Sequence, residues 1–88
     1  AKHWQASRSR LESYRAMIEQ VFDQERLPRE LLWVGLVESG FNPLARSPKN
    51  AVGIWQFIPE TATAFGLRVE GPDERSDPAK STRAAARY

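Results

Sequence analysis

Glu38 and Ser39 are the residues whose position first suggests chemistry, because they interrupt the almost wholly apolar stretch LLWVGLVESGFNP just before a glycine. On a helix, steps of three and four residues bring one carboxyl and three apolar side chains to a single face: Leu27, Leu31, Val34 and Glu38. We therefore expect Glu38 to be partly buried, in a last helical turn where the helix dipole disfavours a negative charge. Both conditions favour a carboxyl group that keeps its proton near neutral pH, as a general acid must.

A structural role for Glu38 is the alternative, since most helical glutamates are solvated or paired with a cation. Any of three cations would serve as the partner: Arg29, Arg46 or Lys49. The chain has no cysteine and a single histidine, His3, close to its first residue. A thiolate metal site is thereby excluded, and a Ser-His-Asp triad or a histidine metal site is not expected.

Four helices are expected to position these groups. Residues 4–25 have apolar residues at helical spacing, and proline, glycine and aspartate mark the other helix ends. The other expected helices run from Pro28 to Ser39 with Gly40 as the C-cap, from Pro59 to a close at Gly66, and from Pro78 onwards after an Asp77 cap. The stretch GIWQFIP is either extended or a helical turn, because periodicity cannot decide over so few residues.

Composition indicates one ordinary globular domain. The 88 residues are 41% hydrophobic and 27% charged, which argues against disorder. The net charge of +2 comes without any run of five basic residues, so a nucleic-acid partner is not expected. No stretch reaches the roughly 18 apolar residues of a membrane span, so no transmembrane segment is expected in this chain.

Two blocks give the sequence a resemblance that extends from about Arg10 to Tyr88. The first is Glu38-Ser39 at the end of an apolar helix; the second is GIWQ, Gly53 to Gln56, which leads into PETA and a later DERSDP segment. In this order the blocks resemble the lytic transglycosylases, the soluble-transglycosylase domain related to goose-type lysozyme, and most of all their membrane-bound lytic transglycosylase D branch. The resemblance implies a mainly α-helical, lysozyme-like fold of about four helices with irregular loops, in which residues 1–88 form a single, partial catalytic domain.

The resemblance also implies roles for individual residues. Glu38 takes the place of the catalytic acid and base, and Ser39 that of a hydroxyl that orients the acid or the sugar. Gln56 matches a glutamine that contacts the saccharide near the scissile bond. Gly53 permits a close approach of the loop, and Trp55 occupies the bulky position of the block.

The implied reaction cleaves the β-1,4 bond between N-acetylmuramic acid and N-acetylglucosamine in peptidoglycan and forms a 1,6-anhydro end. Glycosidases usually need two carboxylates, yet the remaining acidic residues of this region have turn or helix-start contexts: Glu60, Glu70, Asp73, Glu74 and Asp77. In the lytic transglycosylases one glutamate acts first as acid and then as base. We therefore expect no second catalytic carboxylate, no metal and no cofactor.

Peptidoglycan strands are the expected partner, and the periplasm or bacterial cell envelope is the expected location, with lipid anchoring in a parent protein, flanking domains and self-association left open. The family's Ala-Tyr-Asn motif falls after Tyr88, so the last part of the fold is expected to be missing, and Tyr88 itself, in the context AAARY, is not expected to be that tyrosine. A non-catalytic peptidoglycan- or partner-binding module on the same scaffold is the alternative function.

Four aromatic residues are expected in the core rather than as sugar platforms: Trp33, Trp55, Phe57 and Phe65.

Overall fold

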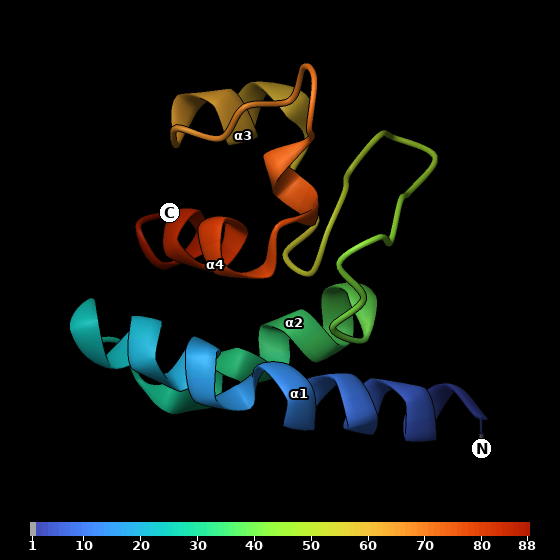
Figure 1. Cartoon of the computed structure of the whole chain (residues 1–88), viewed down its shortest axis with the longest axis vertical. Helices are drawn as coiled ribbons and strands as arrows, with labels where there is room; N and C mark the ends of the chain where they lie inside the picture. The colour runs from blue at the N-terminus through green and yellow to red at the C-terminus, as the bar shows by residue number, and fades with distance from the viewer. Residues whose placement is uncertain (1) are drawn as a thin grey trace.

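The computed structural model describes residues 2–88, apart from the side chains of Lys2, His3, Trp4 and Ser7. The expectation for His3 therefore lies outside the described residues. Within the described range the chain is mainly helical, as expected. Its elements are α1 (Lys2–Gln24), the 3-10 helix η1 (Arg29–Leu31), α2 (Leu32–Ser39), α3 (Pro59–Ala64), the 3-10 helix η2 (Glu74–Ser76) and α4 (Pro78–Ala86) (Figure 1).

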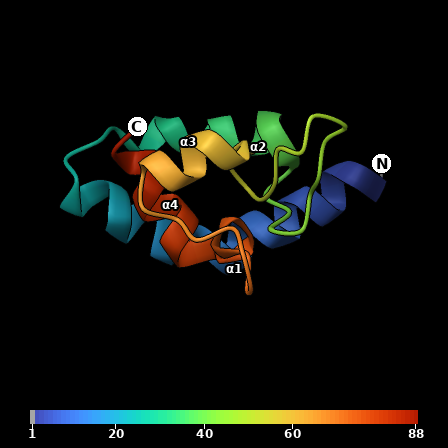
Figure 2. The ribbon, with the colours of Figure 1, turned by 90° about the horizontal axis from the view of Figure 1, so that it is seen from above.

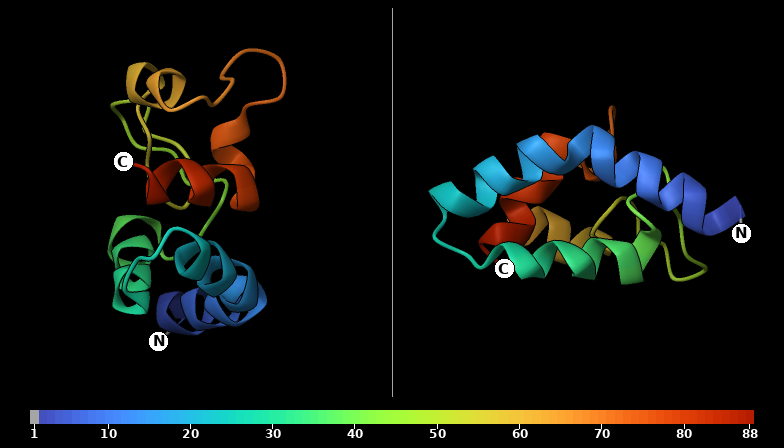
Figure 3. Two further views of the ribbon diagram at one scale, coloured as in Figure 1. Left: turned by 90° about the vertical axis from the view of Figure 1, so that its left-hand side faces the viewer. Right: turned by 90° about the horizontal axis from the view of Figure 1, so that it is seen from below.

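The helices stack in three levels. Helices α1 and α2 lie side by side at the base, α4 crosses above them, and α3 lies beyond α4, as two views at right angles agree (Figure 1 and Figure 3). Seen from above, α3 and α4 lie over this base, and the long loop between α2 and α3 extends beside them (Figure 2). The molecule is flattened, with extents of 33 × 31 × 18 Å.

Helix α1 supplies the largest share of the core. Its apolar face is buried as the spacing predicts, with Leu11, Ile18 and Phe22 packed against residues from the base of α2 and the following loop: Leu32, Phe41 and Ile54. Fully burying one such side chain stabilises the fold by about 1.5–3 kcal/mol. A smaller apolar cluster connects α3 and α4. It consists of Phe57, Ala62, Leu67 and Ala84.

The predicted helix ends are largely confirmed. Gly40 ends α2 in the left-handed conformation with φ 61°, which glycine adopts without steric cost. The Asp77 side chain caps α4 by accepting a hydrogen bond from the Lys80 N–H at 2.9 Å. Pro59 and Pro78 lie in the first turns of α3 and α4. Pro28 differs from its prediction, because its extended ψ of 135° places it before η1 rather than in an α-helical turn.

The GIWQ block forms a tight turn, which is neither of the two conformations expected for it. Val52 and Phe57 pair on either side of it, with N···O distances of 3.0 and 3.2 Å in the two directions. The turn reverses the chain through left-handed φ values of 91° at Gly53 and 55° at Gln56. A reversal of this kind brings Trp55 and Gln56 to the surface between the lower and upper levels.

The placement of aromatic residues in the core is confirmed only in part. Phe57 is buried, and Trp55 and Phe65 are half-buried against the two apolar clusters. Trp33 was expected in the core and is 47% exposed, so that prediction is wrong. The reason is that α2 turns Leu32 and Gly35 toward the core, which directs Trp33 and the neighbouring Val37 outward.

Candidate active site

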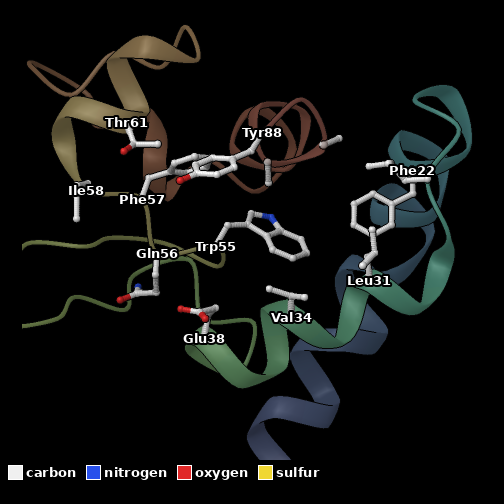
Figure 4. Close-up of a pocket in the computed structure, with 13 residues that line it drawn as sticks. Phe22, Leu31, Val34, Glu38, Trp55, Gln56, Phe57, Ile58, Thr61 and Tyr88 are labelled. Atoms are coloured by element: carbon white, nitrogen blue, oxygen red, sulfur yellow. The ribbon is translucent and has the colours of Figure 1, made fainter.

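A cavity of about 450 Å³ lies between α2, the GIWQ turn, the start of α3 and the end of α4 (Figure 4). Most of its wall is apolar, and three polar side chains interrupt that wall: Glu38, Gln56 and Thr61. The remaining lining residues are Phe22, Leu27, Leu31, Val34, Trp55, Phe57, Ile58, Ala85, Ala86 and Tyr88. A concave, mainly apolar site with a few polar groups is the usual form of a ligand-binding pocket.

Glu38 lies in the last turn of α2, at the same end of the cavity as Gln56 (Figure 4). The face that it shares with Leu31 and Val34 is the predicted one, and all three residues line the cavity. The predicted partial burial is wrong, because Glu38 is exposed and Leu31 and Val34 are 42% and 46% exposed. This face of α2 forms the wall of the cavity instead of packing against the core.

The cation pairings considered for Glu38 are not found in the described part of the chain. Arg29 pairs with Asp23 at 2.7 Å, and Arg46 donates a hydrogen bond to the Asn50 side chain. None of the ion pairs among the described side chains includes Glu38. The carboxyl group is therefore accessible to a ligand in the cavity.

Ser39 does not line the cavity; its hydroxyl joins the two blocks of the site instead. Its Oγ donates to the Ile54 carbonyl oxygen at 2.7 Å and also approaches the Gly35 carbonyl oxygen at 3.2 Å. The first bond links the end of α2, next to Glu38, to the middle of the GIWQ turn. Ser39 therefore fixes the position of the helix end that carries Glu38 relative to the turn that carries Gln56.

Gln56 lines the cavity, and its amide is held by the protein. Its Nε2 donates to the Gly53 carbonyl oxygen at 2.8 Å and to the Ala45 carbonyl oxygen at 3.1 Å. Because both N–H groups are used, the amide oxygen remains as the acceptor for a donor such as a sugar hydroxyl.

Trp55 forms the wall opposite α2. Its Nε1 donates to the Thr82 hydroxyl oxygen on α4 at 2.9 Å, and its ring lies 5.9 Å from that of Phe22, centroid to centroid. The indole is thus held between α1 and α4, with one face on the cavity. The ring therefore packs within the protein and also forms part of the cavity wall.

Gly53 is buried and does not line the cavity. A Cβ atom there would lie 1.9 Å from the main-chain oxygen of Arg75. The close approach expected at Gly53 is therefore an approach to the backbone of η2. Gly53 affects the site only indirectly, because it allows the turn that carries Trp55 and Gln56 to adopt its shape.

Several lining residues were not expected at the site from the sequence, and two of them have side chains that can hydrogen-bond: Thr61 and Tyr88. Thr61 belongs to the PETA segment, two residues after Pro59, and that position in the first turn of α3 was the signal available for it. Tyr88 lines the cavity and stacks on Phe65, with ring centroids 5.0 Å apart and an interplanar angle of 14°. Its local sequence offered no corresponding signal.

Glu38 is the sole carboxylate among the lining residues that the structure describes. The other candidates have separate structural roles or face solvent: Asp73 pairs with Arg75, Glu74 pairs with Lys80, Asp77 caps α4, and Glu60 and Glu70 are exposed. The Arg75 guanidinium, through its hydrogen bonds to Asp73, lowers the pKa of that carboxyl group. Glu74 likewise has a lowered pKa, chiefly because the Lys80 ammonium donates to it.

The described part of the chain contains neither a cluster of metal-ligating side chains nor a helix suited to span a membrane. No group of three or more histidine, cysteine, aspartate or glutamate side chains is placed there to hold a metal ion. None of the helices within residues 2–88 combines the length and the apolar character needed to cross a bilayer.

Residues 16–88 match the sequence profile of the family described as Transglycosylase SLT domain. Among individual relatives, the membrane-bound lytic murein transglycosylase D of Escherichia coli (strain K12) is 42% identical over 77 residues, which cover 86% of this chain and 17% of the relative. The peptidoglycan transglycosylase gp16 of Escherichia phage T7 is 43% identical over 63 residues, or 69% of this chain and 5% of the relative.

A third relative, from Alteromonas sp. (strain M-1), has a name that refers to tributyltin chloride resistance. It is 38% identical over 86 residues, which cover 97% of this chain and 41% of the relative. The chain therefore spans about one-sixth of the Escherichia coli protein and under half of the Alteromonas protein.

Proposed function

The chain belongs to the transglycosylase SLT domain family, and from this membership we propose that residues 1–88 form a single, partial catalytic domain of a peptidoglycan lytic transglycosylase. Its substrate is the β-1,4 bond between N-acetylmuramic acid and N-acetylglucosamine, and its product carries a 1,6-anhydro-muramic acid end. The names of two relatives, which refer to murein and to peptidoglycan, support this substrate.

Glu38 supplies both proton transfers in this proposal. As an acid it protonates the glycosidic oxygen, while the substrate's own N-acetyl group supports the anomeric carbon as the bond breaks. As a carboxylate it then removes the proton of the muramic acid C6 hydroxyl, which attacks the anomeric carbon and closes the anhydro ring. The glutamate ends the cycle protonated, as it began, so the reaction consumes no water and needs no second carboxylate.

The position of Glu38 is the observation that carries the proposal. It is the sole carboxylate on the described wall of the cavity, and Gln56, whose amide oxygen accepts hydrogen bonds, lines the same end. Gln56 and Trp55 bind the saccharide beside the scissile bond, Gln56 through its amide and Trp55 through its ring. Ser39 and Gly53, which lie outside the cavity, contribute by holding α2 and the turn together.

A location in the bacterial cell envelope or periplasm follows from this substrate, since peptidoglycan is found there. The Escherichia coli relative is named as membrane-bound, which supports the same compartment for this chain. Glycan strands are the proposed partner.

The first test is mass spectrometry of the soluble products released from purified peptidoglycan. We expect the chain to release anhydro-muropeptides, and Glu38→Gln to lower the rate by roughly 10²–10⁴-fold, the usual contribution of general acid-base catalysis. Glu30→Gln is the matched control, because Glu30 is an exposed glutamate in η1 that does not line the cavity. Equal activity of Glu38→Gln and the unaltered chain would exclude the proposed role. Retention on peptidoglycan without release of product would support a binding module instead.

A further inference from the structure

Arg75 is the one fully buried charged residue among the described side chains, with 4% of its surface exposed. Removing an arginine from water is strongly unfavourable unless the protein replaces its hydration with good hydrogen bonds. Part of that replacement comes from Asp73, whose carboxylate accepts from Nε at 3.0 Å and from Nη2 at 2.7 Å. This pairing leaves the Nη1 group for contacts elsewhere.

The Nη1 group of Arg75 contacts the main chain on both sides of the GIWQ turn. It donates to the Asn50 carbonyl oxygen at 2.8 Å and to the Phe57 carbonyl oxygen at 3.1 Å. Asn50 precedes the Val52–Phe57 pair, and Phe57 is the residue immediately after Gln56. One guanidinium therefore joins the chain that enters the turn to the chain that leaves it.

The main chain of Arg75 also lies against the turn. Its carbonyl oxygen occupies the space that a side chain at Gly53 would need, 1.9 Å from the Cβ position. The turn is thus held by the side chain of Arg75 at its open end and by the backbone of Arg75 at its first residue. Trp55 and Gln56 of the same turn line the cavity.

We propose that Arg75, with its guanidinium fixed by Asp73, is a positioning residue for the active site. It holds the GIWQ turn so that Gln56 and Trp55 face the glycan beside Glu38. The effect on turnover rests on the proposed function, whereas the effect on the turn does not. Arg75 does not line the cavity, so it acts on the substrate only through the turn.

Arg75→Lys is the variant that tests this role, because it keeps the positive charge but cannot form the same planar set of hydrogen bonds. Arg87→Lys is the matched control, since Arg87 pairs with Glu25 at 3.1 Å on the surface and does not line the Glu38 cavity. We expect NMR spectra of Arg75→Lys to show shifted Gln56 side-chain amide and Trp55 indole resonances. The same resonances should be unchanged in Arg87→Lys. Unchanged resonances in folded Arg75→Lys would overturn the proposal, whether or not the chain is active.

A double-mutant cycle with Gln56→Ala then tests whether Arg75 acts through Gln56. We expect Arg75→Lys alone to lower kcat/KM on peptidoglycan by about 10- to 100-fold, as a small misplacement of a binding group does. In Gln56→Ala the added Arg75→Lys substitution should cause little further loss. Losses that simply multiply would contradict action through Gln56.

Asp73→Asn provides a second route if Arg75→Lys does not fold. It preserves the shape of the pair but removes the charge that fixes the guanidinium, so we expect the same resonances to shift in the same direction. Circular dichroism establishes that each variant is folded. A folded Asp73→Asn with unchanged Gln56 and Trp55 resonances would overturn the proposal.

Discussion

Two buried or half-buried hydroxyl groups beside the cavity are used within the protein. The Ser39 hydroxyl donates to the turn at Ile54, and the Thr82 hydroxyl oxygen accepts from the Trp55 indole. Neither Ser39 nor Thr82 lines the cavity. The Ser39 hydroxyl fixes the end of α2, which carries Glu38, and the Thr82 hydroxyl fixes the Trp55 ring. The polar residues around the site are therefore of two kinds. Some line the cavity, and the others hold the cavity-lining residues in position.

Thr82→Val tests the second of these bonds. Valine keeps the shape of threonine but leaves the Trp55 Nε1–H without its acceptor, so we expect a loss of about 1 kcal/mol in the free energy of unfolding. Urea denaturation measures it. Thr63→Val is the control, because Thr63 is exposed on α3 and bonds only to the Pro59 carbonyl oxygen within its own helix. Equal losses in the two variants would show that the indole bond contributes nothing specific.

Ser39→Ala tests the bond between the two blocks of the site. We expect it to destabilise the fold by about 1 kcal/mol, since the Ile54 carbonyl oxygen loses its donor. Ser13→Ala is the matched control: the Ser13 hydroxyl also bonds to the carbonyl four residues earlier, but on the exposed face of α1. There alanine should be neutral or slightly stabilising, because it is the better helix former. A thermal denaturation series on both variants would refute this if Ser13→Ala lost as much stability as Ser39→Ala.

At the scale of elements, the GIWQ turn is held by contacts with three other parts of the fold. It is paired at its base, bonded to α2 through Ser39 and covered by Arg75. At Gly53 a side chain is disfavoured for two reasons: the φ of 91° and the nearby main-chain oxygen of Arg75.

Gly53→Ala should therefore lower the free energy of unfolding by more than the strain of a left-handed conformation alone explains. A non-glycine residue in that conformation costs roughly 1–2 kcal/mol. Gly66→Ala isolates this cost, because Gly66 has a similar φ of 87° with nothing within 4 Å of its Cβ position. We expect Gly53→Ala to lose about 2 kcal/mol or more beyond Gly66→Ala, since the main chain of Arg75 must move. Similar free energies of unfolding for the two variants would show that the turn yields easily.

The helix ends were predictable because their causes are local. A proline after an aspartate or a glycine after a helical run acts within four residues, and Asp77 and Gly40 behave accordingly. The exposure of Glu38 was not predictable in this way. Helix α2 is apolar on nearly every side, so its sequence cannot say which face meets the core. In the structure Leu32 and Gly35 are buried, and a Cβ atom at Gly35 would lie 2.8 Å from the Phe41 ring. The turn at GIWQ depends in the same way on Arg75, about twenty residues later.

At the scale of the whole molecule, several carboxylates are held in ion pairs with arginine or lysine. Asp73, Glu74 and Asp23 pair with Arg75, Lys80 and Arg29, and each cation holds the pKa of its partner carboxyl group below the ordinary value. A carboxyl group with a lowered pKa in the folded state stabilises the fold above its unfolded pKa. That stabilisation is lost as the pH falls through the folded value. Because unfolded Asp and Glu titrate near 4, we expect the free energy of unfolding to fall as the pH drops below about 4.

Asp73→Asn distinguishes the contribution of the buried Asp73–Arg75 pair to stability from that of the exposed ion pairs. Near pH 7 this variant leaves the Arg75 guanidinium buried beside a neutral amide, so it should be clearly less stable than the unaltered chain. As the pH falls, Asp73 of the unaltered chain becomes protonated too, and the difference between the two proteins should shrink. Asp23→Asn, in a pair whose side chains are 56% and 52% exposed, should differ little from the unaltered chain at any pH. Urea denaturation from pH 7 to pH 2 measures both differences. A gap for Asp73→Asn that stays constant down to pH 2 would mean that the Asp73 charge contributes nothing to holding Arg75, and that shape alone fixes the turn.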